Sequence, residues 1–169
     1  MDFEIVTDSS CNLKEEMIDE FGLHVLPLTF MVDGEQRQSY LKGQVTDLQQ
    51  FYTMMREGKV ITTSLPNLAD SEALLRGLLE AGRDVLYLGF SSGLSGTFDT
   101  ACLFLDQVKQ EIPDLDVRMV DTKLASIAEA FLVYEALRQR EKGLTADEMV
   151  AWAEEARYFV DRQFMVDDL

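Results

Sequence analysis

Basic residues, cysteine, histidine and long apolar runs are all scarce in this chain of 169 residues. Lys and Arg together number 15, against 31 Asp and Glu, which gives a formal net charge of -16. Nucleic acids and anionic membrane surfaces attract proteins mainly through Lys and Arg, so this balance disfavours both as partners. No apolar run approaches the roughly 20 residues of a membrane-spanning helix. We therefore expect no nucleic-acid partner and no membrane span.

The two cysteines, Cys11 and Cys102, cannot form a disulfide framework, so nothing in the sequence points to secretion. They also lack CxxC spacing and histidine neighbours, and a metal site is therefore not expected. The first residues, Met1 to Glu4, are acidic and lack the basic start of a signal peptide. The expected location is the cytoplasm.

What the chain does contain is a globular composition, with 47% hydrophobic and 27% charged residues in the length of one ordinary domain. Short apolar runs predict strands at 3–6, 24–30, 85–90, 117–120 and 164–166. Longer patterns of helical period lie between them, at 13–21, 46–57, 69–81, 97–112, 126–141 and 145–160. Alternating strands and helices predict an α/β fold of three layers, a mostly parallel sheet flanked by helices.

Local signals refine these elements. Pro27 suits an edge or a bulge of a sheet better than its centre, and the stretch 61–67 reads as a hydroxyl-rich loop. Three pairs have the spacing of a capping box at a helix start: Asn12 with Glu15, Thr46 with Gln49, and Thr145 with Glu148.

Ligands of parallel sheets bind outside the carboxyl ends of the strands. Three loops follow predicted strands in this way, at 7–12, 91–97 and 121–126. We expect these loops to lie together and to contain the binding site.

The glycine- and serine-rich segment 89–97 is the most informative of these loops. Its glycines allow sharp turns, so that backbone N–H groups and hydroxyls can face one ligand at a helix N-terminus. The pattern favours an anion site built without a cation, for a phosphate or a carboxylate; the simpler alternative is a plain turn with a capping serine. The residues concerned are Ser91, Ser92, Gly93, Ser95 and Gly96.

Two other segments could support the same site. Asp8 and Ser9 follow the first predicted strand. Thr62, Thr63 and Ser64 offer three hydroxyls in a row, either as a second set of neutral donors to the ligand or as a solvated loop.

Catalysis finds little support. Residues 89–93 match the Gly-x-Ser-x-Gly elbow of hydrolases, which would make Ser91 a nucleophile. The only histidine, His24, precedes the serine instead of following it, so Ser91 lacks a general base, and His24 is better explained as a core or edge strand residue. No Walker-type lysine follows the glycine loop, so nucleotide hydrolysis is not expected either. We assign no catalytic residue.

Six short motifs follow one another along the whole chain: VTDSS at 6–10, VLPL at 25–28, ITTSLP at 61–66, SSGLSGT at 91–97, VDT with a later AS at 120–126, and VDDL at 166–169. Together, and in this order, they resemble the DegV family. Each motif alone is weak, whereas the ordered set is specific.

The resemblance implies a fatty-acid-binding protein, similar to the acyl-carrier subunit of bacterial fatty acid kinase. Such a carrier has no catalytic nucleophile and no cofactor. It holds a long-chain fatty acid such as palmitate and presents it to a separate kinase partner. By motif position, the residues that hold the acyl carboxylate are Thr62 and Ser95.

The resemblance also implies a domain boundary. Members of the family have two α/β domains with the acyl chain between them, and residues 1–169 correspond to the first, with 161–169 leading toward an absent second domain. The family usually has Gln after Thr-Thr-Ser, where this chain has Leu65. Without its second domain, the chain is expected to self-associate through exposed apolar surface. The main alternative function is an enzyme that acts on a small phosphorylated or acylated substrate at the Gly/Ser-rich loop.

Overall fold

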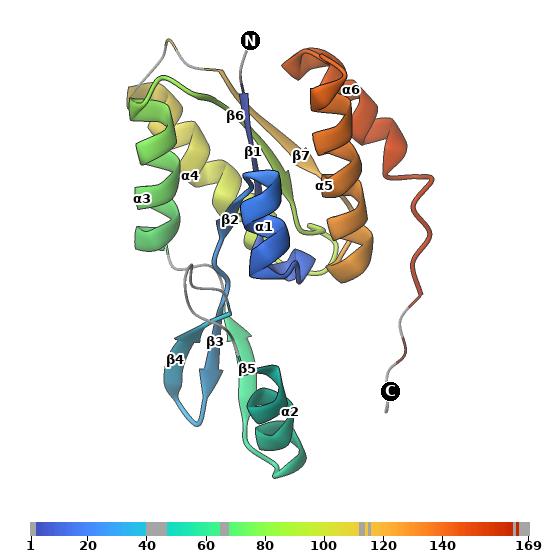
Figure 1. Cartoon of the computed structure of the whole chain (residues 1–169). Helices are drawn as coiled ribbons and strands as arrows, with labels where there is room; N and C mark the ends of the chain where they lie inside the picture. The colour runs from blue at the N-terminus through green and yellow to red at the C-terminus, as the bar shows by residue number, and fades with distance from the viewer. Residues whose placement is uncertain are drawn as a thin grey trace.

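A parallel sheet of four strands forms the centre of the molecule (Figure 1). The computed structural model describes residues 3–39, 47–64, 68–111, 114, 116–163 and 165. The strand order is β2-β1-β6-β7, and all three neighbouring pairs are parallel. The strands are β1 (Phe3–Asp8), β2 (His24–Leu26), β6 (Asp84–Gly89) and β7 (Val117–Asp121). This confirms the predicted α/β fold with a mostly parallel sheet.

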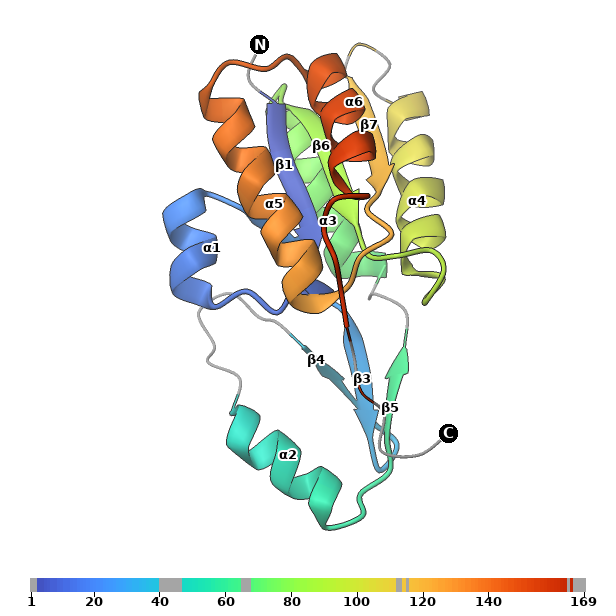
Figure 2. The same cartoon turned by 90° about the vertical axis from the view of Figure 1, so that its right-hand side faces the viewer.

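Helices cover both faces of this sheet, which gives the three predicted layers (Figures 1 and 2). One face carries α1 (Glu15–Phe21), α5 (Ser126–Glu141) and α6 (Ala146–Ala156). The other face carries α3 (Leu68–Glu80) and α4 (Thr97–Glu111). Among the described residues, no helix combines the length and the apolar character needed to cross a membrane.

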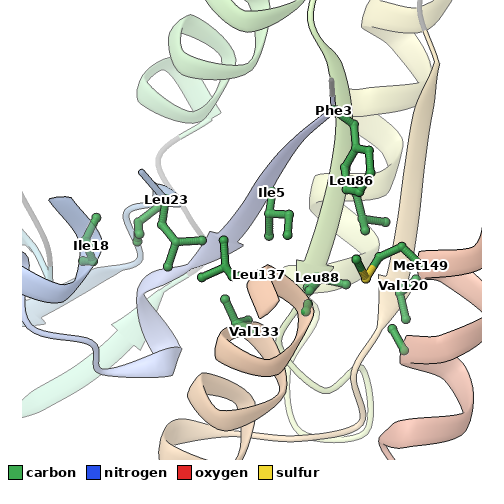
Figure 3. Close-up of a cluster of buried hydrophobic side chains, with 13 residues drawn as sticks. Phe3, Ile5, Ile18, Leu23, Leu86, Leu88, Val120, Val133, Leu137 and Met149 are labelled. Carbon is green, nitrogen blue, oxygen red and sulfur yellow. The ribbon is translucent and has the colours of Figure 1, made fainter. Parts of the chain in front are cut away.

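Successive side chains of a strand point to opposite faces of the sheet, so the strands contribute to both hydrophobic cores. In β6, Leu86 and Leu88 point to the side of α5 and α6, whereas Val85 and Tyr87 point to the side of α3 and α4. This strand is therefore buried on both faces, as the unbroken apolar run predicted. Figure 3 shows the first core, in which strand side chains meet Val133, Leu137 and Met149 from the helices.

A second, antiparallel sheet extends from the end of the main sheet at which its strands finish (Figure 2). It consists of β3 (Thr29–Val32), β4 (Glu35–Gln38) and β5 (Ile61–Ser64), in the order β4-β3-β5, and α2 (Leu48–Arg56) lies beside it. Phe51 of α2 contacts Phe30 of β3 edge to face, with ring centroids 5.4 Å apart. The turn Asp33–Gly34 has positive φ at both residues, which suits a tight hairpin.

Two predictions at this second sheet were wrong. Residues 61–64 were expected in a loop, but they form β5, because β-branched Ile and Thr side chains suit an extended strand and β3 offers an edge to pair with. The run 24–30 was expected to be one strand. It is divided at Pro27, so that β2 ends the main sheet as an edge strand and β3 belongs to the second sheet.

Some helix boundaries also differ from expectation. Asn12 does not cap α1; it adopts a left-handed conformation after the short 3-10 helix η1 (Ser9–Cys11), and Lys14 stands at the N-cap of α1. In α2 the capping side chain is that of Asp47; the expected cap, Thr46, lies outside the described residues. The capping box of Thr145 and Glu148 is confirmed. The helix that it opens ends at Ala156, not near residue 160, and most of the strand expected at 164–166 lies outside the described residues.

Candidate functional site

The three loops that the sequence analysis selected meet at the carboxyl end of the main sheet. β1, β6 and β7 are neighbours, so the segments that follow them start side by side. Hydrogen bonds connect all three: Phe90 N–H to Asp8, Ser92 N–H to Asp121, and the Asn12 side chain to Ser126. The expected position of the site is therefore a real junction of loops in the structure.

Asp8 connects the first loop to the second. Its carboxylate is fully buried and accepts hydrogen bonds from the Tyr87 hydroxyl at 2.8 Å, from Phe90 N–H at 2.9 Å and from Ser10 N–H at 3.1 Å. Three donors satisfy a buried carboxylate well. The carboxylate of Asp8, predicted as a supporting residue, is therefore satisfied by donors inside the protein.

Glu129 of α5 is a second buried acid, which the sequence analysis did not identify. Its side chain is 0% exposed and accepts hydrogen bonds from Thr7 Oγ1 at 3.3 Å and Ser10 Oγ at 2.5 Å. Burial, and then the nearby Asp8 carboxylate, raise the pKa of Glu129 well above its usual value. Nothing local in the sequence marks this residue, because it lies in an ordinary helical pattern 119 residues from Ser10.

Gly89 ends β6 at a point where no side chain fits. A Cβ atom there would lie 2.6 Å from the Tyr87 ring and 2.7 Å from the Phe98 ring. These two rings stack with centroids 5.9 Å apart. The first glycine of the Gly/Ser-rich segment is therefore required by close packing.

Ser91 faces inward and organises its own loop. It is buried, its Oγ accepts from Gly93 N–H at 3.3 Å, and its carbonyl oxygen accepts from the N–H groups of Leu94 and Ser95. Its own N–H donates to the carbonyl of Leu124 in the third loop. These contacts give Ser91 a structural role and do not present it as a nucleophile.

Ser95 lies at the entrance to α4. Its Oγ accepts from Thr97 N–H at 3.2 Å and lies 2.9 Å from Thr97 Oγ1. If Thr97 donates the second of these bonds, the Ser95 hydroxyl proton is free to donate to a ligand. Gly96 beside it is exposed, and the N-terminus of α4 adds partial positive charge at this point.

A cation, Lys123, lies beside this loop, in which the sequence favoured an anion site built without one. Lys123 Nζ lies 2.6 Å from Asp121 Oδ2 and donates to Ser92 Oγ at 2.7 Å. Partial burial raises the pKa of Asp121, but hydrogen bonds from Lys123 and Ser92 outweigh it, so the pKa of this carboxyl lies below its usual value. The signal was present in the sequence, since Lys123 follows the strand ending by two residues.

Ser9 contacts residues next to the second sheet, and Thr62 is part of that sheet. Ser9 Oγ accepts from Leu28 N–H at 2.9 Å and lies 2.5 Å from Ser39 Oγ, so it fixes the start of β3 to the first loop. Thr62 pairs with Met31 in the middle of β5, and its side chain is exposed. Thr63 and Ser64 continue β5 toward the main sheet, and Leu65 lies outside the described residues.

A mostly apolar groove of about 750 Å³ is lined on one side by Leu94, which precedes Ser95 in the chain, and its polar lining residues are Ser126, Asp161, Arg162 and Gln163. It runs between the start of α5 and the segment that follows α6, where large apolar side chains face solvent: Ile127 is 79% exposed and Phe159 81%. Phe131 and Val160 complete its apolar wall. The Gly/Ser-rich loop therefore borders an open, mostly apolar groove through Leu94.

Other candidate chemistry is not supported by the described part of the chain. His24 lies on the edge strand β2, with Nε2 3.7 Å from Glu4 Oε2. Burial raises the pKa of the Cys11 thiol to about 12, which keeps it protonated and unreactive. In the residues that the structure describes, no group of three or more His, Cys, Asp or Glu side chains could hold a metal ion.

Comparison with known proteins gave a consistent result. A family model described as "Uncharacterised protein, DegV family" matches residues 2–169. DegV domain-containing proteins of Clostridium perfringens and Lactococcus lactis are 30% and 32% identical over 99% and 100% of this chain. The chain spans only 57% and 58% of those two proteins, so it corresponds to little more than half of their length.

Solved structures agree with the fold. A DegV family protein from Thermus thermophilus, described by its fatty-acid binding, is 31% identical, with a TM-score of 0.79 over 94% of this chain and 54% of that one. Protein TM841 from Thermotoga maritima, reported to reveal a fatty acid binding function, is 30% identical, with a TM-score of 0.77 over 92% of this chain and 55% of its own.

Proposed function

Because the chain belongs to the DegV family, we propose that it is a non-catalytic domain that binds a long-chain fatty acid, such as palmitate. The observation that carries this proposal is the apolar groove of about 750 Å³ that starts beside the hydroxyl-rich loop. A fatty acid has the matching form, with one anionic end and one long apolar chain. The fatty-acid-binding relatives of known structure support the same assignment.

The carboxylate end is assigned to Ser95 and Thr62. Ser95 can donate its hydroxyl proton while it accepts from Thr97, and the N-terminus of α4 favours negative charge there. Thr62 is exposed on β5, in the sheet that extends from the same end of the main sheet. Backbone N–H groups of the Ser91–Thr97 loop would complete the set of donors.

The alkyl chain is assigned to the groove between Leu94 and Phe159. Burial of each CH₂ group contributes about 0.8 kcal/mol, which corresponds to roughly a fourfold gain in affinity. In the absence of a ligand, the same exposed side chains are expected to promote self-association of this chain.

An enzymatic role is less well supported. Ser91 is buried and its hydroxyl already accepts a hydrogen bond, and His24 is held in β2 beside Glu4. We propose instead that the protein presents its fatty acid to a separate kinase in the cytoplasm, as the family resemblance implies. We further infer that residues 1–169 are the N-terminal α/β domain of such a carrier, with residues 161–169 leading toward a second domain.

Calorimetric titration with saturated fatty acids of increasing length tests the proposal. Affinity should rise by about fourfold per CH₂ until the groove is filled. Ser95→Ala and Thr62→Val should each weaken binding, because a hydrogen bond to a charged group contributes about 1.5–3 kcal/mol.

Thr53→Val provides a matched control, since Thr53 is an exposed threonine on α2 whose hydroxyl bonds within its own helix. It should leave the affinity unchanged. Binding that does not depend on chain length would argue against the groove. Equal affinity of the Ser95 and Thr62 variants with wild type would remove these residues from the head-group site.

The kinase step requires its own assay. A fatty acid kinase supplied with ATP should form acyl phosphate only when this protein carries the fatty acid. Equal rates with free fatty acid would contradict presentation by the protein and would leave the binding result standing.

A further inference from the structure

Three of the few basic residues in this acidic chain surround one cavity. Lys123, Arg157 and Arg162 line a pocket of about 490 Å³ at the carboxyl end of β7. Its other wall residues include Tyr158, Phe159 and Asp161. In a protein with 15 basic and 31 acidic residues, such a gathering of cations needs a physical explanation.

Two of these cations are held in place by the same residue. Lys123 Nζ lies 2.6 Å from Asp121 Oδ2, and Arg157 Nη1 donates to the backbone carbonyl of Asp121 at 2.6 Å. Asp121 Oδ1 also accepts from Lys123 N–H at 3.0 Å. Lys123 itself has φ of +57°, a conformation that costs free energy in a non-glycine residue. Both cations are therefore attached to Asp121 at the end of the strand.

The cavity retains unused positive charge and donor capacity. Lys123, Arg157 and Arg162 exceed the two nearby acids, Asp121 and Asp161, by one charge, and the acceptors of Asp121 are already engaged. Arg157 Nε is buried without a hydrogen-bond acceptor among the described residues. The Arg157 guanidinium thus keeps hydrogen-bonding capacity beyond the one bond that Nη1 donates to Asp121.

We propose that Lys123, Arg157 and Arg162 form a binding site for a phosphate group. Guanidinium groups match phosphate oxygens with two parallel hydrogen bonds, and lysine adds a compact point charge. The site differs from the proposed head-group site at Thr62 and Ser95, and it does not depend on fatty-acid binding. Its occupant is inorganic phosphate or a phosphomonoester.

The residues that line the cavity indicate which phosphate compounds it favours as ligands. Tyr158 and Phe159 are exposed aromatic residues, and the Arg157 guanidinium lies 5.2 Å from the Tyr158 ring centroid. The segment Phe159–Arg162 also lines the apolar groove, so the two cavities share a wall. A phosphate attached to an aromatic ring or to an alkyl chain could use these surfaces in addition to the cations.

Amide NMR titrations of the chain with inorganic phosphate, phenyl phosphate and dodecyl phosphate, without any fatty acid, test the inference. We expect saturable shifts at Ser92, Lys123 and residues 157–162 with all three probes. Equal affinities would identify phosphate alone as the ligand. Tighter binding of phenyl or dodecyl phosphate would identify a phosphomonoester with an aromatic or apolar group.

Arg162→Gln and Lys123→Gln should each weaken phosphate binding by about three- to tenfold, a range between exposed and buried charge pairs. Arg162→Lys should recover part of the loss. Lys109→Gln is the matched control, because Lys109 is an exposed residue of α4 away from the cavity, and it should bind like wild type. Arg162 is itself exposed, so its variants are expected to fold.

Failure of inorganic phosphate to give saturable shifts would overturn the proposal. So would binding of any probe that Arg162→Gln and Lys123→Gln leave unchanged, since the cations would then be irrelevant. A loss as large in Lys109→Gln would show a general charge effect and would also refute it. Inorganic phosphate has no alkyl chain, and Lys123 does not line the apolar groove, so inorganic phosphate with Lys123→Gln tests this site separately from fatty-acid binding.

Discussion

Glu129 allows the arrangement beneath the loops to be tested through its ionisation. Its carboxyl is 0% exposed, and burial together with the Asp8 carboxylate raises its pKa well above the usual value. The folded protein therefore favours the neutral acid. The stability that this preference contributes is fully present below the unfolded pKa of about 4.3, and it is lost as the pH rises through the folded pKa.

Glu129→Gln keeps the size of the side chain and cannot ionise. It should match wild type near pH 4 and become the more stable protein as the pH rises toward 8, because only wild type must then retain a proton or bury a second charge. Glu129→Ala should destabilise at every pH. It removes the acceptor of Thr7 and Ser10, at about 1–3 kcal/mol for each hydroxyl left unsatisfied.

Including the small cavity, the loss in Glu129→Ala should be about 3–5 kcal/mol, or a fall in Tm of roughly 10 °C for a chain of this size. Urea unfolding followed by circular dichroism between pH 4 and 8 measures both effects. Glu154→Gln, an exposed residue of α6, controls for the loss of one negative charge. A pH dependence of Glu129→Gln identical to that of wild type would refute a neutral, buried Glu129.

Three further predictions concern the same region. Asp8→Asn should lower the free energy of unfolding, measured in urea, by about 2–3 kcal/mol, because the hydroxyl of Tyr87 and the N–H of Phe90 lose a charged acceptor. The control Asp106→Asn, at an exposed position, should change this free energy little. Gly89→Ala should lower the free energy of unfolding by about 1–3 kcal/mol, because the new methyl group overpacks against Tyr87, whereas Gly77→Ala, in a helix with open space around it, should raise it by about 0.4–1 kcal/mol; loss of stability in both would contradict the argument from local space. Cys11, with a buried thiol of pKa about 12, should resist alkylation at pH 8, and half-buried Cys102, of pKa about 11, should react first; mass spectrometry of the modified peptides decides.

Periodicity was sufficient to predict most of the main fold. The continuous apolar run at 85–90 indicated a strand buried on both faces, and β6 has this position next to β1 and β7. The capping box at Thr145 was also readable, because it depends on residues three apart. These features depend on residues that are close together in the chain, so a single sequence is enough to predict them.

The second sheet was not predictable in the same way. β5 forms because β3 offers it a partner, and Pro27 directs the chain from one sheet into the other; neither effect is visible from the run of side chains alone. For the same reason, only some of the residues at the loop junction were predicted. Hydroxyl-rich loops at strand ends were recognisable, whereas Glu129 reaches the junction from α5 and Arg157 from the residue that follows α6, both distant in sequence.

The hydrogen bonds of Asp8 have a consequence for how the protein folds. Its partners Tyr87 and Phe90 lie 79 and 82 residues away, and they come within reach only when β1 pairs with β6. Long-range pairing of this kind forms late, because the entropy of closing a large loop opposes it. The loops at the strand ends should therefore become ordered in the same cooperative step as the sheet, and a ligand that needs them would stabilise only the completed fold.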